Sequence, residues 1–326
     1  MVGARRAWPA LAISILLSCS PLEEGGPRGD VTFGVVGDAP YRWWEEGQFD
    51  YLMEVLDRDS LDMLVHVGDL FWRPCSGDRM RNRLNRLLAQ RHPVLYTPGD
   101  NDWTDCWGRA EGGYEPLERL DTLRSVFFPQ PGMTTGSGGG FEMEYQGSRP
   151  EWSEFVENTR WTMADALFMT VHIVGSWNGF AEFDGRSAAD DEAARRRTEA
   201  AAAWLAEGFA EARESEAKAV VIFTHSFPDE ATYSAPHREA FEPYLQTLEE
   251  EVAAYSAPVV LVHGDHHDYT VDQPLADRRT GRTLDNFTRL QTMGSPQVGW
   301  VRVTITFADG EARFDYSPRV VSGLRF

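Results

Sequence analysis

The sequence has few basic residues and no apolar run long enough to cross a bilayer. In 326 residues, 31 Lys and Arg stand against 51 Asp and Glu, which gives a formal net charge of −20. An acidic surface repels phosphate backbones, so we expect no nucleic acid partner. An acidic chain can still bind phosphate where a metal ion inverts the local charge. The excess of carboxylates therefore leaves room for a metal site in one cleft.

Cysteine is scarce, and several common motifs are missing. The chain has three cysteines, and none of them shows the C-x-x-C spacing of structural zinc sites. The segment Gly-Ser-Trp-Asn-Gly at residues 175–179 lacks the G-x-S-x-G spacing of a serine hydrolase nucleophile. No internal repeat or long low-complexity tract is present, so nothing indicates a repeat architecture.

The first thirty residues are typical of an export signal followed by a tether. A basic start precedes a short apolar run over residues 10–17. The run continues into Leu-Leu-Ser-Cys, ending at Cys19, which resembles a bacterial lipobox and predicts lipidation of that cysteine. We therefore expect a signal peptide over residues 1–19, a tether over residues 20–30 and a lipid-anchored protein at the bacterial cell envelope. Ordinary cleavage that releases a soluble protein is the alternative.

Export would place the other two cysteines, Cys75 and Cys106, in an oxidising compartment. Two is an even number, and such compartments permit disulfides, so we predict a bond between them. Metal binding by two lone thiols is the weaker alternative.

Short apolar runs alternate with amphipathic segments along the chain. The runs are rich in β-branched residues and nearly continuous, as buried strands are. They cover residues 31–38, 63–69, 93–100, 167–176, 219–225 and 258–265. Helices are predicted over residues 46–58, 79–91, 190–216 and 237–255, and an Asp-Gly turn joins late strands over 300–307 and 311–316. This alternation predicts one α/β domain from about residue 31 to residue 326.

Five of the predicted strands end in an acidic residue or a histidine. These residues are Asp38, Asp69, Asp100, His225 and Asp265, and each of the four Asp follows a Gly. Ligands of open α/β sheets bind beyond the carboxyl ends of the strands. A single Asp in such a place is more often a turn residue or a cap. Four carboxylates gathered at one rim would repel one another unless cations neutralise them, which favours a metal site.

The succession of these blocks resembles the calcineurin-like metallophosphoesterase superfamily. The blocks are Gly37-Asp38, Gly68-Asp69, Gly99-Asp100-Asn101-Asp102, Thr224-His225 and Gly264-Asp265-His266-His267. The chain looks closest to a bacterial exported subgroup with a GDN[E/D]W block, here within residues 97–106. The resemblance implies a four-layer α/β/β/α sandwich with two mixed sheets, and hydrolysis of phosphomonoesters or phosphodiesters at a dinuclear metal site.

The resemblance also implies a ligand set. Asp38, Asp69 and His267 would hold one metal, and the second would be held by Asp69, Asp100, His225 and Asp265. Two metals orient phosphate oxygens and lower the pKa of a bound water. Because this set is rich in oxygen, we expect Mn, Mg or Fe rather than Zn.

Several positions depart from the family pattern. Pro40 stands where a His ligand is usual, and Trp72 stands where purple acid phosphatases have a Tyr ligand. Asn101 replaces the His that protonates the leaving oxygen; an amide can donate a hydrogen bond but cannot give up a proton at neutral pH. We expect Asn101 and Asp102 to act in catalysis. The contribution of Asn101 should be weaker than that of a histidine, because its amide cannot transfer a proton.

Three histidines beside the strand ends are candidates for a replacement acid. They are His263, His266 and His66, and each could equally orient a ligand or pack in the core. Trp43 and Trp44 are expected to pack in the core, with a wall of the cleft as the alternative.

Two functions remain open. One is a metal-dependent phosphoesterase that acts on a small phosphoester at the cell envelope. The other is a catalytically weak, metal-bound binding module that recognises a phosphate-bearing envelope ligand. The retained ligands favour the first, and Asn101 with Pro40 favours the second.

Overall fold

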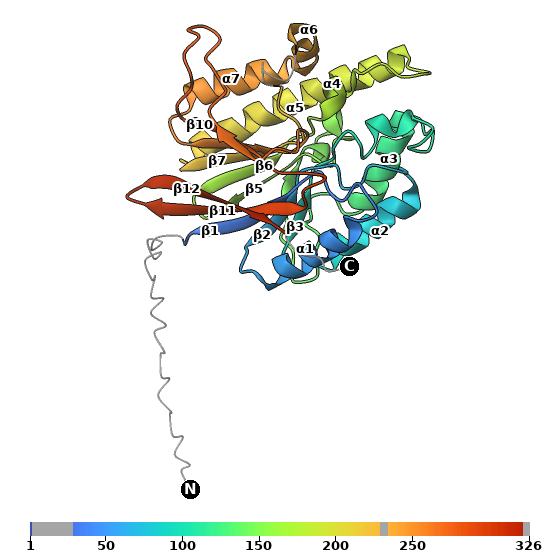
Figure 1. Ribbon diagram of the computed structural model, residues 1–326. Helices are drawn as coiled ribbons and strands as arrows, with labels where there is room; N and C mark the ends of the chain where they lie inside the picture. The colour runs from blue at the N-terminus through green and yellow to red at the C-terminus, as the bar shows by residue number, and fades with distance from the viewer. Residues whose placement is uncertain (2–28, 229–233, 322–326) are drawn as a thin grey trace.

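The computed structural model describes Met1 and residues 29–228 and 234–321. Two β-sheets lie face to face, and helices cover the outer face of each (Figure 1). One sheet has five strands in the order β12-β11-β1-β2-β3, and the other has seven in the order β4-β5-β6-β7-β8-β10-β9. Both sheets contain parallel and antiparallel pairs. The predicted four-layer α/β/β/α sandwich with two mixed sheets is confirmed.

The elements have the following bounds. The strands are β1 (Val31–Val36), β2 (Met63–His66), β3 (Val94–Tyr96), β4 (Glu144–Tyr145), β5 (Thr159–Met163), β6 (Ala166–Thr170), β7 (Ala219–Phe223), β8 (Val259–His263), β9 (Thr270–Asp272), β10 (Phe287–Gln291), β11 (Gly299–Ala308) and β12 (Glu311–Val320). The helices are α1 (Glu46–Arg58), α2 (Gly77–Leu88), α3 (Pro116–Phe127), α4 (Gly175–Gly179), α5 (Ala188–Glu214), α6 (Ala235–Arg238) and α7 (Tyr244–Ala254). Short 3-10 turns are η1 (Thr104–Trp107), η2 (Gln146–Ser148), η3 (Pro150–Trp152) and η4 (Glu239–Phe241).

Strand side chains divide between two cores because successive residues point to opposite faces. In β7, Val221 and Phe223 enter the core between the two sheets, while Val220 and Ile222 face the helices. The inter-sheet core is completed from the five-stranded sheet by residues such as Phe33, whose ring meets Phe223 edge-on at 5.7 Å. Both faces of the central strands are therefore buried, which explains their continuous apolar sequence.

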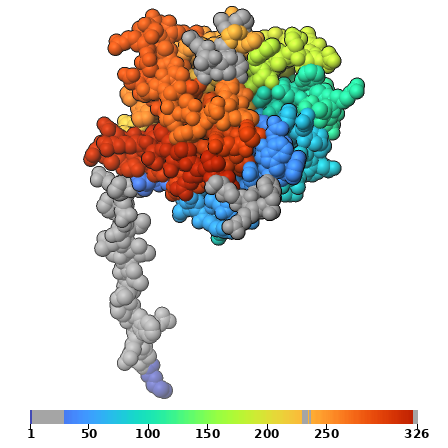
Figure 2. All heavy atoms as spheres, in the orientation of Figure 1, coloured from blue at the N-terminus to red at the C-terminus, as the bar shows by residue number. Residues whose placement is uncertain are grey.

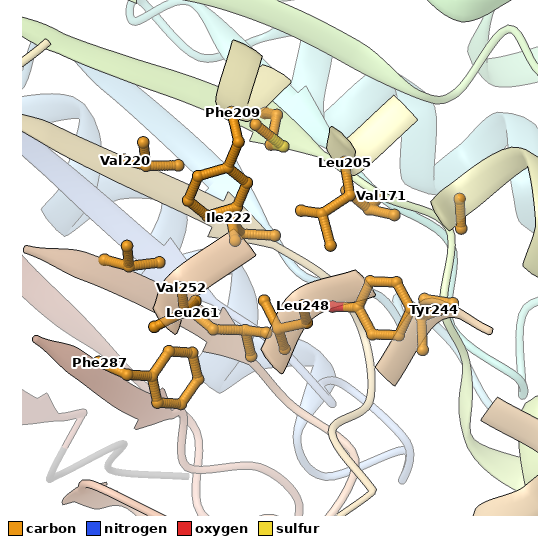
Figure 3. Packing of buried hydrophobic residues seen from close by; sticks show 14 of the residues in the cluster. Val171, Leu205, Phe209, Val220, Ile222, Tyr244, Leu248, Val252, Leu261 and Phe287 are labelled. Carbon is orange, nitrogen blue, oxygen red and sulfur yellow. The ribbon is translucent and has the colours of Figure 1, made fainter. Parts of the chain in front are cut away.

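Each outer helical layer has its own core. On the seven-stranded sheet, α5 and α7 contribute Leu205, Phe209 and Leu248, which surround strand residues such as Ile222 (Figure 3). On the five-stranded sheet, helices α1, α2 and α3 pack a separate cluster that includes Phe49. These two helical layers fix the sheets and hence the loops at the strand ends.

Helix boundaries differ from the sequence prediction where prolines and caps intervene. Helix α1 has the predicted bounds, whereas α2 begins two residues earlier than predicted because the Ser76 side chain accepts from the Arg79 amide. The prediction of a single helix over residues 237–255 is wrong. Helix α6 and the 3-10 turn η4 come first, and α7 begins only after Pro243. A proline cannot continue a helix that it follows, since it lacks an amide hydrogen and clashes with the preceding turn.

The late hairpin forms as predicted. Strands β11 and β12 pair antiparallel around the turn at Asp309 and Gly310, and β11 also pairs with β1. In the space-filling view these red strands cross one face of the molecule, between orange and blue segments (Figure 2). The chain's last strands thus complete the sheet that begins with its first.

The predicted signal, Cys19 and most of the tether lie outside the described residues. Within the described ranges, no helix combines the length and apolar character that a membrane crossing needs.

Candidate metal centre

The loops that follow the strands bring the predicted ligands together. β1, β2 and β3 are parallel neighbours, and so are β7 and β8 in the other sheet. Their carboxyl ends therefore lie along one edge of the two-sheet sandwich. Two groups of three ligand atoms each fall within 4.8 Å of one another: Asp38, Asp69 and His225 form one, and Asp100, His225 and Asp265 form the other.

The backbone at this edge is bent into an uncommon conformation. Asp38, Asp69, Asp265 and His267 have φ angles of 53°, 56°, 74° and 67°. The left-handed region is disfavoured for residues other than glycine, and departures of this kind gather at functional sites. The bends let each strand end turn its side chain toward the shared centre.

His225 lies between the two groups of ligands. Its Nε2 is 2.9 Å from Asp100 Oδ1, 3.4 Å from Asp69 Oδ1 and 3.9 Å from Asp265 Oδ1. Its Nδ1 lies 2.8 Å from the carbonyl oxygen of Val67, which can only accept. Nδ1 therefore carries a proton and donates to Val67, and Nε2 is the nitrogen that faces the carboxylates, where a metal-binding imidazole would offer its ligand atom.

His267 is oriented in the same way on the other side. Its Nδ1 donates to the Ser295 carbonyl oxygen at 2.6 Å, and its Nε2 is 3.6 Å from Asp38 Oδ1. Asp38 is fully buried, and its Oδ2 has no hydrogen-bond partner among the described residues. A buried carboxylate oxygen without a partner is costly unless a cation occupies the space beside it.

The electrostatics of the cluster fit a cation site. Burial raises the pKa of Asp38 to about 6 and that of Asp69 well above its usual range, and nearby carboxylates add to both shifts. Burial also works against protonation of His225, but Asp69 and Asp100 raise its pKa well above the ordinary value. Carboxylate oxygens and imidazole nitrogens are common ligands of divalent metal ions. The residues present thus fit a metal site.

Two glycines allow this close approach. A Cβ atom at Gly99 would lie 2.1 Å from Asp69 Oδ1. At Gly175 it would lie 2.5 Å from Asp265 Oδ1 and 2.7 Å from Asp100 Oδ2. Any side chain at either position would push into the carboxylates, so glycine is required by the packing of the centre.

Asp102 lies beneath the metal ligands and is engaged by the protein itself. Its fully buried carboxylate accepts from the backbone amides of Asp69, Leu70 and Gly99 at 2.8, 2.9 and 2.9 Å, and from the Tyr96 hydroxyl at 2.7 Å. Its oxygens are thus engaged in holding the loop after β2 against the loop after β3. Through these bonds Asp102 positions Asp69, and its expected part in catalysis stays a prediction.

Asn101 contacts the central carboxylate, together with a tyrosine that the sequence reading missed. The Asn101 amide nitrogen Nδ2 is 2.5 Å from Asp69 Oδ2 and 3.0 Å from the Tyr41 hydroxyl. That hydroxyl also donates to Asp69 Oδ2, and the Tyr41 ring meets the His267 ring edge-on at 5.3 Å. Tyr41 directly follows Pro40 in the sequence, and its contact with Asp69 forms only in the folded chain.

A second missed group lies beside Asp100. The Ser176 hydroxyl is 3.0 Å from Asp100 Oδ2 and 2.8 Å from Asp105 Oδ1. Burial, and then the charge of Asp100, raise the pKa of Asp105 to about 7. Segment α4 presents Ser176 through a left-handed turn, with φ angles of 47°, 54° and 53° from Ser176 to Asn178. The strand predicted to continue to Ser176 ends at Thr170, and no periodic pattern reveals such a turn.

The three histidines named as possible acids differ in place. His66 and His263 are fully buried, and burial lowers the pKa of His66 to about 3 and that of His263 well below its usual range. Both rings are therefore neutral and removed from solvent, which argues against a role as proton donor. His266 is partly exposed, with Nε2 3.8 Å from Asp265 Oδ2. It is the one of the three that borders the cluster from the solvent side.

The predicted disulfide is present between Cys75 and Cys106. It joins the loop after β2 to the loop after β3, and these loops carry Asp69 and Asp100. The bond therefore ties together two segments whose ligands must stay close.

Comparison with known proteins agrees with this geometry. The family model for calcineurin-like phosphoesterases matches residues 31–269. Among curated proteins, no sequence matches this chain. A dimetal phosphatase from Danio rerio is similar in structure, with a TM-score of 0.52 and 14% identity over 90% of this chain and 99% of that chain. A phosphopantetheinyl hydrolase from Mycobacterium tuberculosis has a TM-score of 0.43 and 16% identity over 82% of this chain and 91% of that chain. At these identities the likeness shows the fold alone.

Proposed function

Because this chain belongs to the calcineurin-like phosphoesterase family, we propose that its metal-dependent phosphoesterase activity resides in a dinuclear centre built on the strand ends described above. The observation that carries the proposal is the position of His225, whose Nε2 faces carboxylates of both ligand groups. Asp69, which lies within reach of His225 and of the Asn101 amide, is the bridging ligand in this proposal. Asp38 and His267 complete one side, and Asp100 with Asp265 completes the other.

The metals would supply Lewis-acid charge and an activated water when bound. The chain's own groups set the geometry. Val67 and Ser295 fix the tautomers of the two histidines, and Asp102 holds the amides that shape the Asp69 loop. Orientation of this kind commonly matters as much as the ligand itself.

Proton donation to the leaving oxygen is the weak step. Asn101 can offer a hydrogen bond from its amide, and Tyr41 can offer one from its hydroxyl, but an amide cannot transfer a proton at neutral pH. General acid catalysis typically contributes about 10²- to 10⁴-fold. We therefore expect phosphoesters with good leaving groups, such as aryl esters, to be hydrolysed faster than alkyl esters.

The test compares Asp69→Asn with the unchanged protein. Metal content and hydrolysis of p-nitrophenyl phosphate should fall together, because an amide offers one neutral oxygen in place of the charged carboxylate that would hold the ions. Asp184→Asn is the matched control, because Asp184 is exposed and this substitution removes the same charge. Full metal content and full activity in Asp69→Asn would overturn the assignment. Metal binding without any hydrolysis in the unchanged protein would instead favour the catalytically weak binding module, for which the replacement at Asn101 is the supporting observation.

We also propose export and a lipid anchor at the bacterial cell envelope, supported by the apolar run and the Leu-Leu-Ser-Cys sequence that ends at Cys19. The membrane would then be a partner only through the anchor, and the substrate a small phosphoester. Cys19→Ala should move the protein from the membrane fraction to the soluble fraction without loss of hydrolysis. An unchanged distribution would contradict the anchor.

A further inference from the structure

A rim of exposed aromatic and arginine side chains adjoins the metal centre. Trp43 is 80% exposed and Trp44 is 37% exposed, which corrects the expectation that both pack in the core. Their ring centroids lie 5.6 Å apart, and the Arg42 guanidinium lies 5.3 Å from the Trp44 ring. Large exposed aromatic side chains in a cluster commonly mark a binding surface.

A chain of side-chain contacts connects this rim to the centre. The Tyr41 hydroxyl donates to Asp69, and the Tyr41 ring lies 6.0 Å from the ring of Trp72. Trp72 is in turn flanked by two guanidinium groups, at 4.1 Å from Arg73 and 6.0 Å from Arg42. A group bound on the rim would therefore be a neighbour of a phosphate bound at Asp69.

The loop that carries the rim is fixed by a buried carboxylate. Glu45 accepts from the backbone amides of Tyr41 at 2.7 Å and Arg42 at 3.1 Å. Its other oxygen accepts from the Ser295 hydroxyl at 2.8 Å, and the Ser295 carbonyl also orients His267. One buried network thus positions both the rim and a metal ligand, so the rim is preorganised relative to the centre.

The arginines of the rim lack the close carboxylate partners that many other arginines of this protein have. The chain has a net charge of −20, and the buried Arg83 and the partly buried Arg124 are held by carboxylates at 2.7 and 2.6 Å. In the part of the chain that the structure describes, no carboxylate lies within ion-pair distance of Arg42, and Glu111 approaches Arg73 only to 3.9 Å. Guanidinium groups that lack a close counter-ion are suited to bind an anionic ligand.

We propose that Arg42, Arg73 and Trp44 form a specificity subsite for the part of the substrate that does not react. Its ligand is a phosphoester that also carries a planar ring and a second anionic group, the chemistry of a nucleoside bisphosphate. The ring stacks on the exposed tryptophan, and the second phosphate binds the guanidinium groups. This inference rests on the proposed function for the reacting phosphate alone.

The experiment measures inhibition constants against hydrolysis of p-nitrophenyl phosphate by the metal-loaded protein. The competitors are glycerol 3-phosphate, adenosine 5′-monophosphate and adenosine 3′,5′-bisphosphate, which are all alkyl phosphomonoesters. We expect affinity to rise in that order. Arg42→Gln and Arg73→Gln should each reduce the preference for the bisphosphate over the monophosphate about tenfold, as loss of a charge-assisted hydrogen bond does. Trp44→Leu should reduce the preference for the monophosphate over glycerol 3-phosphate roughly five- to tenfold.

Arg81→Gln is the matched control, because Arg81 is an exposed arginine of α2 that pairs with Asp78 away from the rim. It should leave all three inhibition constants unchanged. Equal affinities for the three competitors, or equal effects of the control and the rim variants, would overturn the subsite. A loss of binding to phosphatidylglycerol vesicles in the rim variants, with unchanged inhibition constants, would also overturn it and assign the rim to a membrane surface. If p-nitrophenyl phosphate is not hydrolysed, the proposed function fails, and calorimetric titration of the same three ligands still tests the subsite.

Discussion

The orientation of a few side-chain atoms determines the chemistry of the metal centre. Two histidine rings have their tautomers set by backbone carbonyl oxygens, so that each presents Nε2 to carboxylates. Beside them, Asn101 contacts Asp69 with its amide, at the position where we propose that the family has an imidazole. In this proposal the strand ends still bring the metal ligands together, while the proton donor differs.

Restoring the family side chain tests this difference. Asn101→His should raise the hydrolysis rate of an alkyl phosphoester more than that of an aryl phosphoester, because only the alkyl leaving group needs a proton. The rise should be about tenfold or more, the lower part of what general acids contribute. Asn101→Gln controls for the change in size. Equal effects on both ester types would show that another group, such as His266 or Tyr41, already donates the proton.

The close approach at Gly175 makes a second prediction at this scale. In Gly175→Ala the added Cβ would lie within 2.7 Å of oxygens from both Asp265 and Asp100. Both carboxylates must shift, so we expect metal affinity to fall at least about tenfold, as displaced ligand groups cause. Isothermal titration with Mn²⁺ measures the change. Gly29→Ala is the control, since nothing lies within 4 Å of a Cβ there; equal affinities in the two variants would contradict the geometry.

Among the elements, helices α1 and α2 are joined by one carboxylate. Glu46, in the first turn of α1, accepts from Arg83 at 2.7 Å through both oxygens, and from Arg79 at 3.1 Å and Arg86 at 2.8 Å. Burial opposes ionisation of Glu46, but the hydrogen bonds and charges of these arginines lower its pKa to about 2. The pair of helices that supports β1, β2 and β3 is thus fixed by charge as well as by apolar packing.

A pH-dependent stability follows from that pKa. Because the pKa of Glu46 is lower in the folded state than its usual 4.5, the stabilisation is complete above pH 4.5 and is lost as the pH falls toward 2. Glu46→Gln should lower the free energy of unfolding by about 1–3 kcal/mol at pH 7, since Arg83 is left buried without its partner. Urea unfolding should show that the difference in the free energy of unfolding between the variant and the unchanged protein becomes smaller below pH 4.5. The control is Glu54→Gln, on the exposed face of α1, which should change the free energy of unfolding by less than about 0.5 kcal/mol. A destabilisation by Glu46→Gln that does not vary with pH would contradict this explanation.

The elements also show where sequence reasoning succeeds. Buried strands that are followed by Gly-Asp can be predicted from the sequence, because apolar runs and strand-end carboxylates are both local patterns. Asp38, Asp69 and Asp100 follow β1, β2 and β3 in this way. The left-handed turn at Ser176 has no such pattern, because its residues are held by tertiary contacts such as that with Asp100. The exposure of Trp43 could not be predicted from the sequence either, since an aromatic residue beside a strand end is most often buried.

At the scale of the whole molecule, the four layers explain how an acidic protein can carry a phosphate site. The two sheets place five chemically active strand ends at one edge, and the helical layers hold that edge rigid. The disulfide between Cys75 and Cys106 ties two of the loops there. The sequence predicted the layers and this bond, because the layers follow from the family resemblance and the cysteine pairing follows from the expected compartment. It could not predict Tyr41, whose contact with Asp69 joins residues from different loops.

Metals held by these strand ends should be required for hydrolysis. The most direct test removes metal with a chelator and adds Mn²⁺ back, while bound metal per chain and p-nitrophenyl phosphate hydrolysis are measured in the same sample. We expect no hydrolysis in the stripped protein and a return of activity that saturates at about two ions per chain. Hydrolysis that persists without metal, or two bound ions that restore none, would contradict it.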